Sequence, residues 1–178
     1  MLTPGPACVL YENLKSIKPL FGSSDNEYTI ISEAVLDWVL RLSGQDEIVM
    51  AQGSATFSLE LAAHSFVQGR VLIVSTGYYG DRLKKILPKD IETTICHYEE
   101  LGNIKNKFDW IMCAYTETSI AFKVDLPIVK KKADELGARL YLDATGSIGL
   151  EDNHELADVT AFSSYNGLFG LTGACFVA

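Results

Sequence analysis

Short apolar, β-branched segments alternate with amphipathic helical patterns along most of this chain of 178 residues. Such alternation is typical of strand–helix–strand units, in which each helix returns the chain so that the next strand runs parallel to the last. The sequence therefore predicts an α/β fold with a doubly wound, mainly parallel sheet and helices on both faces. The predicted strands are residues 48–51, 71–75, 93–97, 110–114, 139–143, 159–162 and 174–177.

Two of the predicted helices carry end signals. Residues 31–42 place five apolar side chains on one face, namely Ile31, Val35, Trp38, Val39 and Leu42. Gly44 follows this helix as a stop, and residues 126–136 repeat the pattern with Pro127 in the first turn and Gly137 beyond the end. No internal repeat, low-complexity tract or linker interrupts the chain, so we expect residues 1–178 to form a single domain.

Composition and charge exclude several classes of protein. The hydrophobic fraction of 48% is ordinary for a globular chain, and no apolar run reaches membrane-spanning length. A formal net charge of -8 argues against a nucleic-acid partner, because phosphate binding requires a basic surface. The start of the chain has no basic region followed by an apolar core, so we expect no secretory signal and a cytoplasmic location.

The cysteines and histidines predict neither a metal site nor a thiol nucleophile. Cys8, Cys96, Cys113 and Cys175 are widely scattered, and we expect reduced thiols in the core. The spacing of His64, His97 and His154 builds no metal site. Asp81-Arg82 stands at a helix start, where we interpret Asp81 as a favourable charge in the first turn.

Two segments lie where open α/β sheets bind ligands. Residues 53–56, Gly-Ser-Ala-Thr, join a strand to a helix expected to begin at Phe57. Free backbone N–H groups and the positive end of a helix dipole there suit a phosphate, although a tight turn with an N-cap explains the same residues. Asp143 ends a strand at the edge where such sheets bind ligands, and the alternative is a capping aspartate.

These segments belong to a series of motifs in a fixed order: residues 2–6, 52–56, 74–82, 117–119, 140–149 and 158–173. Together they resemble the N-terminal half of the class V transaminases that depend on pyridoxal 5′-phosphate (PLP). The resemblance implies the large cofactor-binding domain of fold-type-I aminotransferases, apparently truncated, without the small C-terminal domain. Motif order and spacing look most like 2-aminoethylphosphonate:pyruvate transaminases, with alanine or serine:glyoxylate transaminases next.

The resemblance also implies roles for individual residues. Gly53, Ser54, Ala55 and Thr56 correspond to the phosphate site, to which Ser163 and Ser164 add hydroxyls, and Tyr165 lines it. Tyr79 is the expected stacking partner of the pyridine ring, a hydroxyl of Thr118 or Ser119 reaches the ring oxygen, and Asp143 pairs with the ring nitrogen. The chain departs from the family at Tyr115-Thr116 and Ile120-Ala121, where a histidine and a glycine are usual.

Asn166 occupies the position of the family's Schiff-base lysine. An asparagine amide is not nucleophilic, because its nitrogen lone pair is delocalised, and it does not titrate near neutral pH. No lysine follows Lys132 in the chain. We therefore expect PLP to bind without a covalent bond, and transfer of an amino group from a small amine or amino acid to a 2-oxo acid such as pyruvate or glyoxylate to be impaired.

Alternative functions stay open at this point. The chain ends at Ala178 inside an apolar strand, whereas family members continue, so a complementing C-terminal chain would make it one piece of a split enzyme. A non-catalytic interaction or assembly module that reuses the fold is the third hypothesis. The expected protein partner is a second copy of the chain, in a homodimer, or a complementing C-terminal chain. A generic nucleotide-binding domain is a weaker idea, because both usual phosphate-loop motifs are missing.

Overall fold

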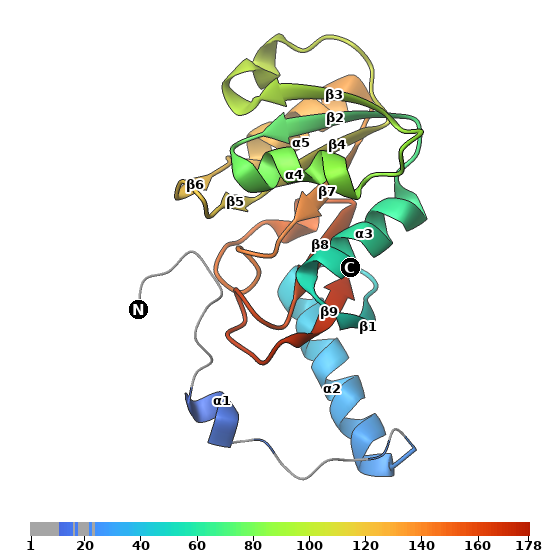
Figure 1. Cartoon of the computed structure of the whole chain (residues 1–178), viewed down its shortest axis with the longest axis vertical. Helices are drawn as coiled ribbons and strands as arrows, with labels where there is room; N and C mark the ends of the chain where they lie inside the picture. Colours follow the sequence, from blue (N-terminus) through green and yellow to red (C-terminus); the bar gives the residue numbers. More distant parts are fainter. Residues whose placement is uncertain (1–10, 16, 18–21, 23) are drawn as a thin grey trace.

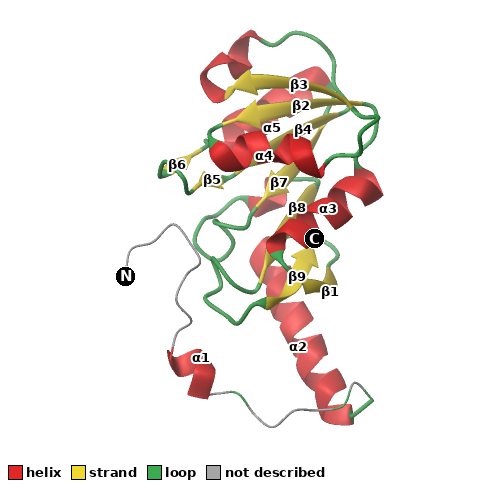
Figure 2. Ribbon diagram, in the orientation of Figure 1, coloured by secondary structure: helices red, strands yellow, loops and turns green. Residues whose placement is uncertain are grey.

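A seven-stranded sheet with helices on both faces forms the centre of the computed structural model, which describes residues 11–15, 17, 22 and 24–178 (Figures 1 and 2). The predicted α/β fold is confirmed, and the ends of the predicted strands shift by no more than one or two residues. The strands of this sheet are β1 (Val49–Gly53), β2 (Arg70–Ser75), β3 (Glu92–His97), β4 (Trp110–Ala114), β7 (Arg139–Asp143), β8 (Val159–Ser163) and β9 (Gly173–Val177).

The strand order is β1-β9-β8-β7-β4-β2-β3. The five strands from β8 to β3 are parallel, whereas β9 is antiparallel to both β8 and β1. Two successive reversals give β1 the direction of β8. The carboxyl ends of β1, β7 and β8 therefore lie at one edge of the sheet, together with the start of β9, and this edge is where open α/β sheets bind ligands.

The helices are α1 (Tyr11–Lys15), α2 (Asn26–Ser43), α3 (Ala55–Phe66), α4 (Tyr78–Ile86) and α5 (Leu126–Leu136). Helix α5 has the predicted bounds. Helix α3 begins two residues before the expected Phe57, because the Ser54 hydroxyl caps it and accepts a hydrogen bond from the Phe57 N–H at 3.3 Å. Shorter elements are the 3-10 helices η1 (Tyr98–Asn103) and η2 (His154–Leu156) and the β5 (Thr116–Glu117) and β6 (Phe122–Lys123) ribbon.

Successive residues of the central strands pack into different layers, because side chains alternate between the faces of a sheet. On one face, Leu72 and Val74 of β2 belong to a buried cluster with Val129 of α5. On the other face, Val71 and Ile73 join a cluster that contains Leu59 of α3 and Leu83 and Ile86 of α4. Packing of α3 and α4 against the sheet fixes the starts of both helices near the ligand-binding edge.

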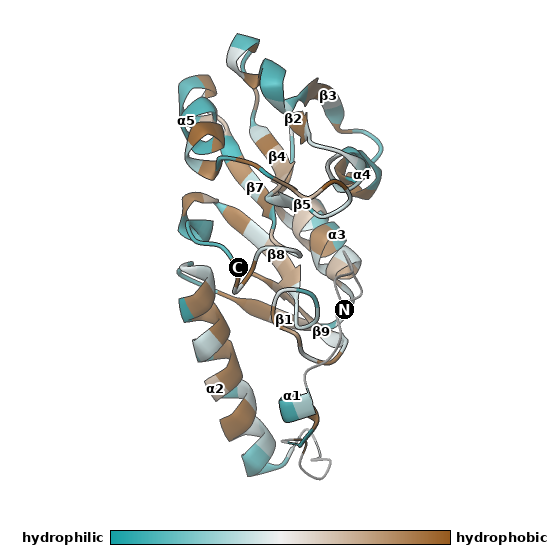
Figure 3. Ribbon diagram, turned by 90° about the vertical axis from the view of Figure 1, so that its left-hand side faces the viewer, coloured by the Kyte–Doolittle hydropathy of each residue, from teal (hydrophilic) through white to brown (hydrophobic). Residues whose placement is uncertain are grey.

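Helix α2 is confirmed as a helix, but most of its predicted apolar face is exposed. Val39 is buried, whereas Ile31, Val35 and Trp38 are 43%, 40% and 50% exposed. The helix projects beyond the end of the sheet, and its apolar residues are visible along it in Figure 3. Helical periodicity thus identified an amphipathic helix without indicating what covers its apolar face.

Cys96, Cys113 and Cys175 are buried and free, as predicted, and Cys8 lies outside the described residues. Burial raises the pKa of the Cys113 thiol to about 12 and that of Cys96 to about 11, so neither is a thiolate at neutral pH. His64 and His97 are exposed, and His154 is buried. Throughout the described part of the chain, no helix is long and apolar enough to cross a membrane.

Candidate cofactor-binding site

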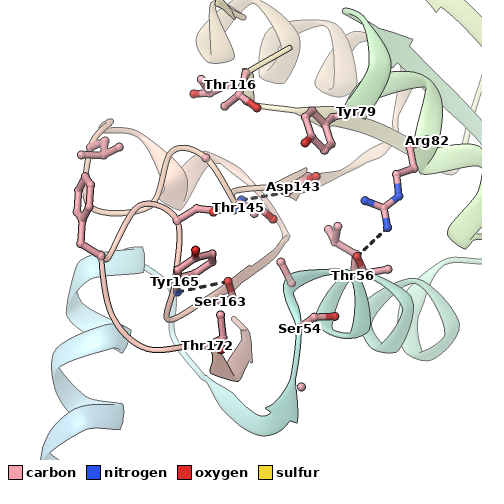
Figure 4. Close-up of a pocket in the computed structure, with 18 of the residues that line it drawn as sticks. Ser54, Thr56, Tyr79, Arg82, Thr116, Asp143, Thr145, Ser163, Tyr165 and Thr172 are labelled. Atoms are coloured by element: carbon pink, nitrogen blue, oxygen red, sulfur yellow. Dashed lines mark hydrogen bonds between the residues drawn. The ribbon is translucent and has the colours of Figure 1, made fainter. Parts of the chain in front are cut away.

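A cavity of about 690 Å³ opens at the edge where β1, β7 and β8 end (Figure 4). It is lined by the N-terminal residues of α3, one side of α4, the β5 segment and the loops after β7 and β8. The lining residues include ten of the predicted site residues, namely Gly53, Ser54, Ala55, Thr56, Tyr79, Thr118, Asp143, Ser163, Tyr165 and Asn166. Segments more than 100 residues apart in the sequence thus meet around one space.

Two predicted residues, Ser119 and Ser164, do not line this cavity. The Ser119 hydroxyl donates a hydrogen bond to the Glu117 carboxylate. The Ser164 hydroxyl donates to the backbone oxygens of Leu171, at 2.6 Å, and Ala174, at 3.1 Å. Of the alternatives Thr118 and Ser119, only Thr118 is positioned to contact a ligand in the cavity. The predicted segment 2–6 lies outside the described residues.

The start of α3 offers backbone donors to the cavity. The first N–H groups of a helix have no acceptor within the helix, and here they belong to Ala55 and Thr56, both of which line the cavity. A Cβ atom at Gly53 would lie 2.6 Å from Cδ1 of Phe57, so a side chain at residue 53 would displace the Phe57 ring from its place at the start of the helix. The resulting positive helix end suits an anionic group such as phosphate.

Asp143, the last residue of β7, brings a carboxylate to the cavity. The residue is 7% exposed, and its Oδ1 atom accepts a hydrogen bond from the Thr145 N–H at 2.9 Å. Burial raises the pKa of Asp143, while the hydrogen bond from the Thr145 N–H and the positive charge of Arg82 act in the opposite direction. A carboxylate with so little water around it is stabilised by a cationic or protonated ligand group, such as a protonated pyridine nitrogen.

Glu117 holds the helix that carries Tyr79. Its carboxylate is fully buried, and Oε2 accepts hydrogen bonds from the backbone N–H groups of Tyr79 and Gly80, both at 2.9 Å. The backbone N–H of Ser119 donates to Oε1 at 3.2 Å. Glu117 therefore caps the start of α4 and fixes the position of the Tyr79 ring at the cavity. This role of Glu117 was not predicted, because the two residues whose N–H groups it accepts lie 38 and 37 positions away in the sequence.

Arg82 is a further residue whose role was not predicted from the sequence. Asp81 accepts a hydrogen bond from the Ser75 hydroxyl at 2.6 Å, in keeping with the predicted structural role. Arg82, in contrast, lines the cavity, and its Nη2 donates to the Thr56 hydroxyl at 2.8 Å (Figure 4). Its spacing of three residues from Tyr79, which places both on one helix face, is the signal that identifies it.

His154 stabilises the loop behind the cavity. The Ser147 hydroxyl and Nε2 of His154 are hydrogen-bonded at 2.9 Å, and both residues are buried. The His154 ring packs edge-on against Tyr115 at 5.3 Å between centroids. Burial is the main cause that lowers the pKa of His154. Across the described residues, no group of histidine, cysteine or carboxylate side chains is arranged to hold a metal ion.

This lowered pKa predicts a pH dependence of stability. Below the ordinary histidine pKa of about 6.5, the unfolded chain binds a proton more readily than the folded chain, so the free energy of unfolding decreases as pH falls. Urea unfolding between about pH 7.5 and pH 5.5 measures the change. His154→Gln, which keeps a hydrogen-bonding side chain but does not titrate, is expected to weaken the dependence. If the free energy of unfolding depends on pH equally in both proteins, the carboxylates and not His154 cause the dependence.

No protein-family model matches the chain. The 2-aminoethylphosphonate–pyruvate transaminase of Pseudomonas aeruginosa is 28% identical over 197 aligned positions, which cover 99% of this chain and 53% of that protein. The chain spans about half the length of the curated relatives it matches.

Solved aminotransferase structures share the fold. Pyridoxamine–pyruvate aminotransferase from Mesorhizobium loti superposes with a TM-score of 0.86 at 18% identity, covering 99% of this chain and 50% of that one. Ureidoglycine–glyoxylate aminotransferase from Bacillus subtilis gives a TM-score of 0.82 at 19% identity, with the same coverage of both chains. The expected aminotransferase fold is therefore confirmed over nearly the whole chain.

Proposed function

We propose that this chain is a PLP-binding protein that holds its cofactor without a covalent bond. It has the fold of fold-type-I aminotransferases and matches the N-terminal half of 2-aminoethylphosphonate–pyruvate transaminases. The observation that carries the proposal is the cavity itself. The free donors of α3, the buried carboxylate of Asp143 and the carboxamide residue Asn166 all line it, and no lysine of the described part of the chain does.

The residues present fit such a cofactor. The N–H groups of Ala55 and Thr56 suit the phosphate, the Tyr79 ring suits stacking, and Asp143 suits a protonated ring nitrogen. Thr116 adds an independent observation, since its buried Oγ1 has no hydrogen-bond partner among the described residues although the residue lines the cavity. Buried hydroxyls normally have partners, and a polar ligand would supply one.

Bound PLP supplies an electron-withdrawing ring that stabilises negative charge on an amino substrate. The chain's own residues bind and orient that ring, and the buried Asp143 carboxylate favours its protonated form. Asn166 neither attacks a carbonyl nor moves a proton at neutral pH. The proposed activity is transfer of an amino group to a 2-oxo acid from a small donor of the 2-aminoethylphosphonate, alanine or serine type. Without a lysine at residue 166, this activity is impaired in the chain.

A titration with PLP tests the proposal. We expect saturable binding to the purified chain, and no adduct on any cavity residue when the complex is desalted, reduced with borohydride and mapped by peptide mass. Asp143→Asn is expected to weaken binding at least about tenfold, because the ring nitrogen loses its ionised partner. Asp90→Asn, on the exposed surface, is the matched control and should bind as the wild type does. Absence of binding by the wild type would remove the cofactor from the proposal.

The exposed apolar face of α2 favours a second candidate function. Ile31, Val35 and Trp38 form a surface suited to burial against another polypeptide. This surface would serve a non-catalytic assembly module or a homodimer. It would also serve one piece of a split enzyme that is completed by a C-terminal chain. Sedimentation with and without PLP distinguishes the candidates, since a stable oligomer that binds no PLP fits the assembly module alone.

A further inference from the structure

Arg82 is a cation that lines the cavity. Among the described residues it takes part in no ion pair. A guanidinium has five N–H donors, and the hydrogen bond that Arg82 makes within the described residues goes to a neutral hydroxyl, that of Thr56 at 2.8 Å. Its remaining donors are available to an anion in the cavity.

The contact with Thr56 also places this cation. Thr56 is the second residue of α3, so the guanidinium lies beside the N–H groups that begin this helix. A guanidinium and a helix N-terminus both favour negative charge, and a phosphate can accept paired hydrogen bonds from the planar guanidinium while it accepts others from the backbone.

We propose that Arg82 binds the phosphate of the cofactor and makes the cavity selective for phosphorylated over unphosphorylated pyridoxal compounds. The proposal rests on the proposed function, because it concerns the same cavity and the same ligand. Arg82 joins the start of α3 in one anion-binding site, to which two helices, α3 and α4, contribute.

An alternative role for Arg82 makes a different prediction. Its charge also favours the ionised form of Asp143, the predicted partner of the ring nitrogen. If Arg82 acted only through Asp143, its loss would weaken every ligand that carries the pyridine ring, with or without phosphate. If it binds the phosphate, its loss weakens the phosphorylated ligands alone.

Pyridoxamine 5′-phosphate and pyridoxamine separate the two roles, and as amines they form no adducts with surface lysines. Calorimetric titrations give the dissociation constants of both ligands for the wild type, Arg82→Gln and Arg82→Lys. Arg41→Gln is the matched control, since the Arg41 side chain is 67% exposed on α2. Near-ultraviolet circular dichroism compares the folded state of the variants.

We expect Arg82→Gln to decrease the selectivity for the phosphorylated ligand at least about tenfold, with the affinity for pyridoxamine unchanged within about twofold. Arg82→Lys should lose less, because it keeps the charge but not the paired donors. As a test on the wild type alone, inorganic phosphate should compete with pyridoxamine 5′-phosphate and not with pyridoxamine.

Equal weakening of both ligands, or selectivity unchanged in Arg82→Gln, would overturn the role of Arg82 and leave the proposed function standing. Failure of the wild type to bind either ligand would overturn both. Competition by inorganic phosphate against both ligands would also contradict the phosphate role, and this last outcome does not depend on the folding of any variant.

Discussion

Asn166→Lys is expected to convert a chain that releases PLP on desalting into one that retains it on residue 166. The residue lines the cavity and is half-buried, and its backbone has no positive φ, so a lysine fits there without backbone strain. The new amine is a nucleophile held beside the bound aldehyde, which raises its effective concentration far above that of surface lysines. After borohydride reduction, peptide mapping should find at least about tenfold more phosphopyridoxyl adduct at residue 166 than at any surface lysine.

Two variants control this experiment. Asn166→Gln keeps a carboxamide and should form no adduct. Asp90→Lys adds a lysine on the exposed surface and measures reaction outside the cavity. If Asn166→Lys is labelled no more than Asp90→Lys while PLP still binds, the aldehyde does not face residue 166, and the orientation expected from the family is wrong for this chain.

The sheet was predictable from the sequence because parallel strands buried on both faces are continuous apolar runs, as in β2 and β4. The carboxyl ends of the predicted strands mark the edge of the sheet where ligands bind. Asp143 and residues 53–56 stand at such strand ends, so they were predicted as site residues. The ribbon of β5 and β6 was not predicted, since strands of two residues have no measurable periodicity.

Hydrogen-bond partners were the part that sequence could not supply. Ser119 and Ser164 match the motifs, but their hydroxyls donate to Glu117 and to backbone oxygens. Arg82 matches no expected ligand, yet it lines the cavity. A motif fixes which residue types stand near the site, whereas three-dimensional contacts decide which of their polar atoms remain available to a ligand.

Glu117 links the stability of the fold to the position of Tyr79. Its buried carboxylate accepts the N–H groups of Tyr79 and Gly80 and both donors of Ser119. Gly77 permits this contact, because a Cβ atom there would lie 2.9 Å from Cγ of Glu117 and its φ of 150° is one that other residues rarely adopt. The start of α4 is thus built around one carboxylate.

Glu117→Ala is expected to decrease the free energy of unfolding by about 3 kcal/mol or more, because it leaves buried donors without an acceptor and opens a cavity. Glu117→Gln should lose less, since an amide oxygen still accepts from Tyr79 and Gly80 while the new NH₂ group faces the Ser119 N–H. Urea unfolding measures both, with the exposed Glu99→Ala as the matched control, expected within about 0.5 kcal/mol of the wild type.

The affinity of the folded Glu117→Gln protein for pyridoxamine then measures whether the Tyr79 ring keeps its position in the cavity. If the carboxylate positions the stacking ring, the variant binds pyridoxamine more weakly than the wild type under conditions where both are fully folded. A loss of stability without a loss of affinity would separate the two roles and show that α4 keeps its place through Leu83 and Ile86, which pack into the core. A stability loss below about 1 kcal/mol would mean that water satisfies the freed N–H groups, and that Glu117 is not the residue that fixes the start of α4.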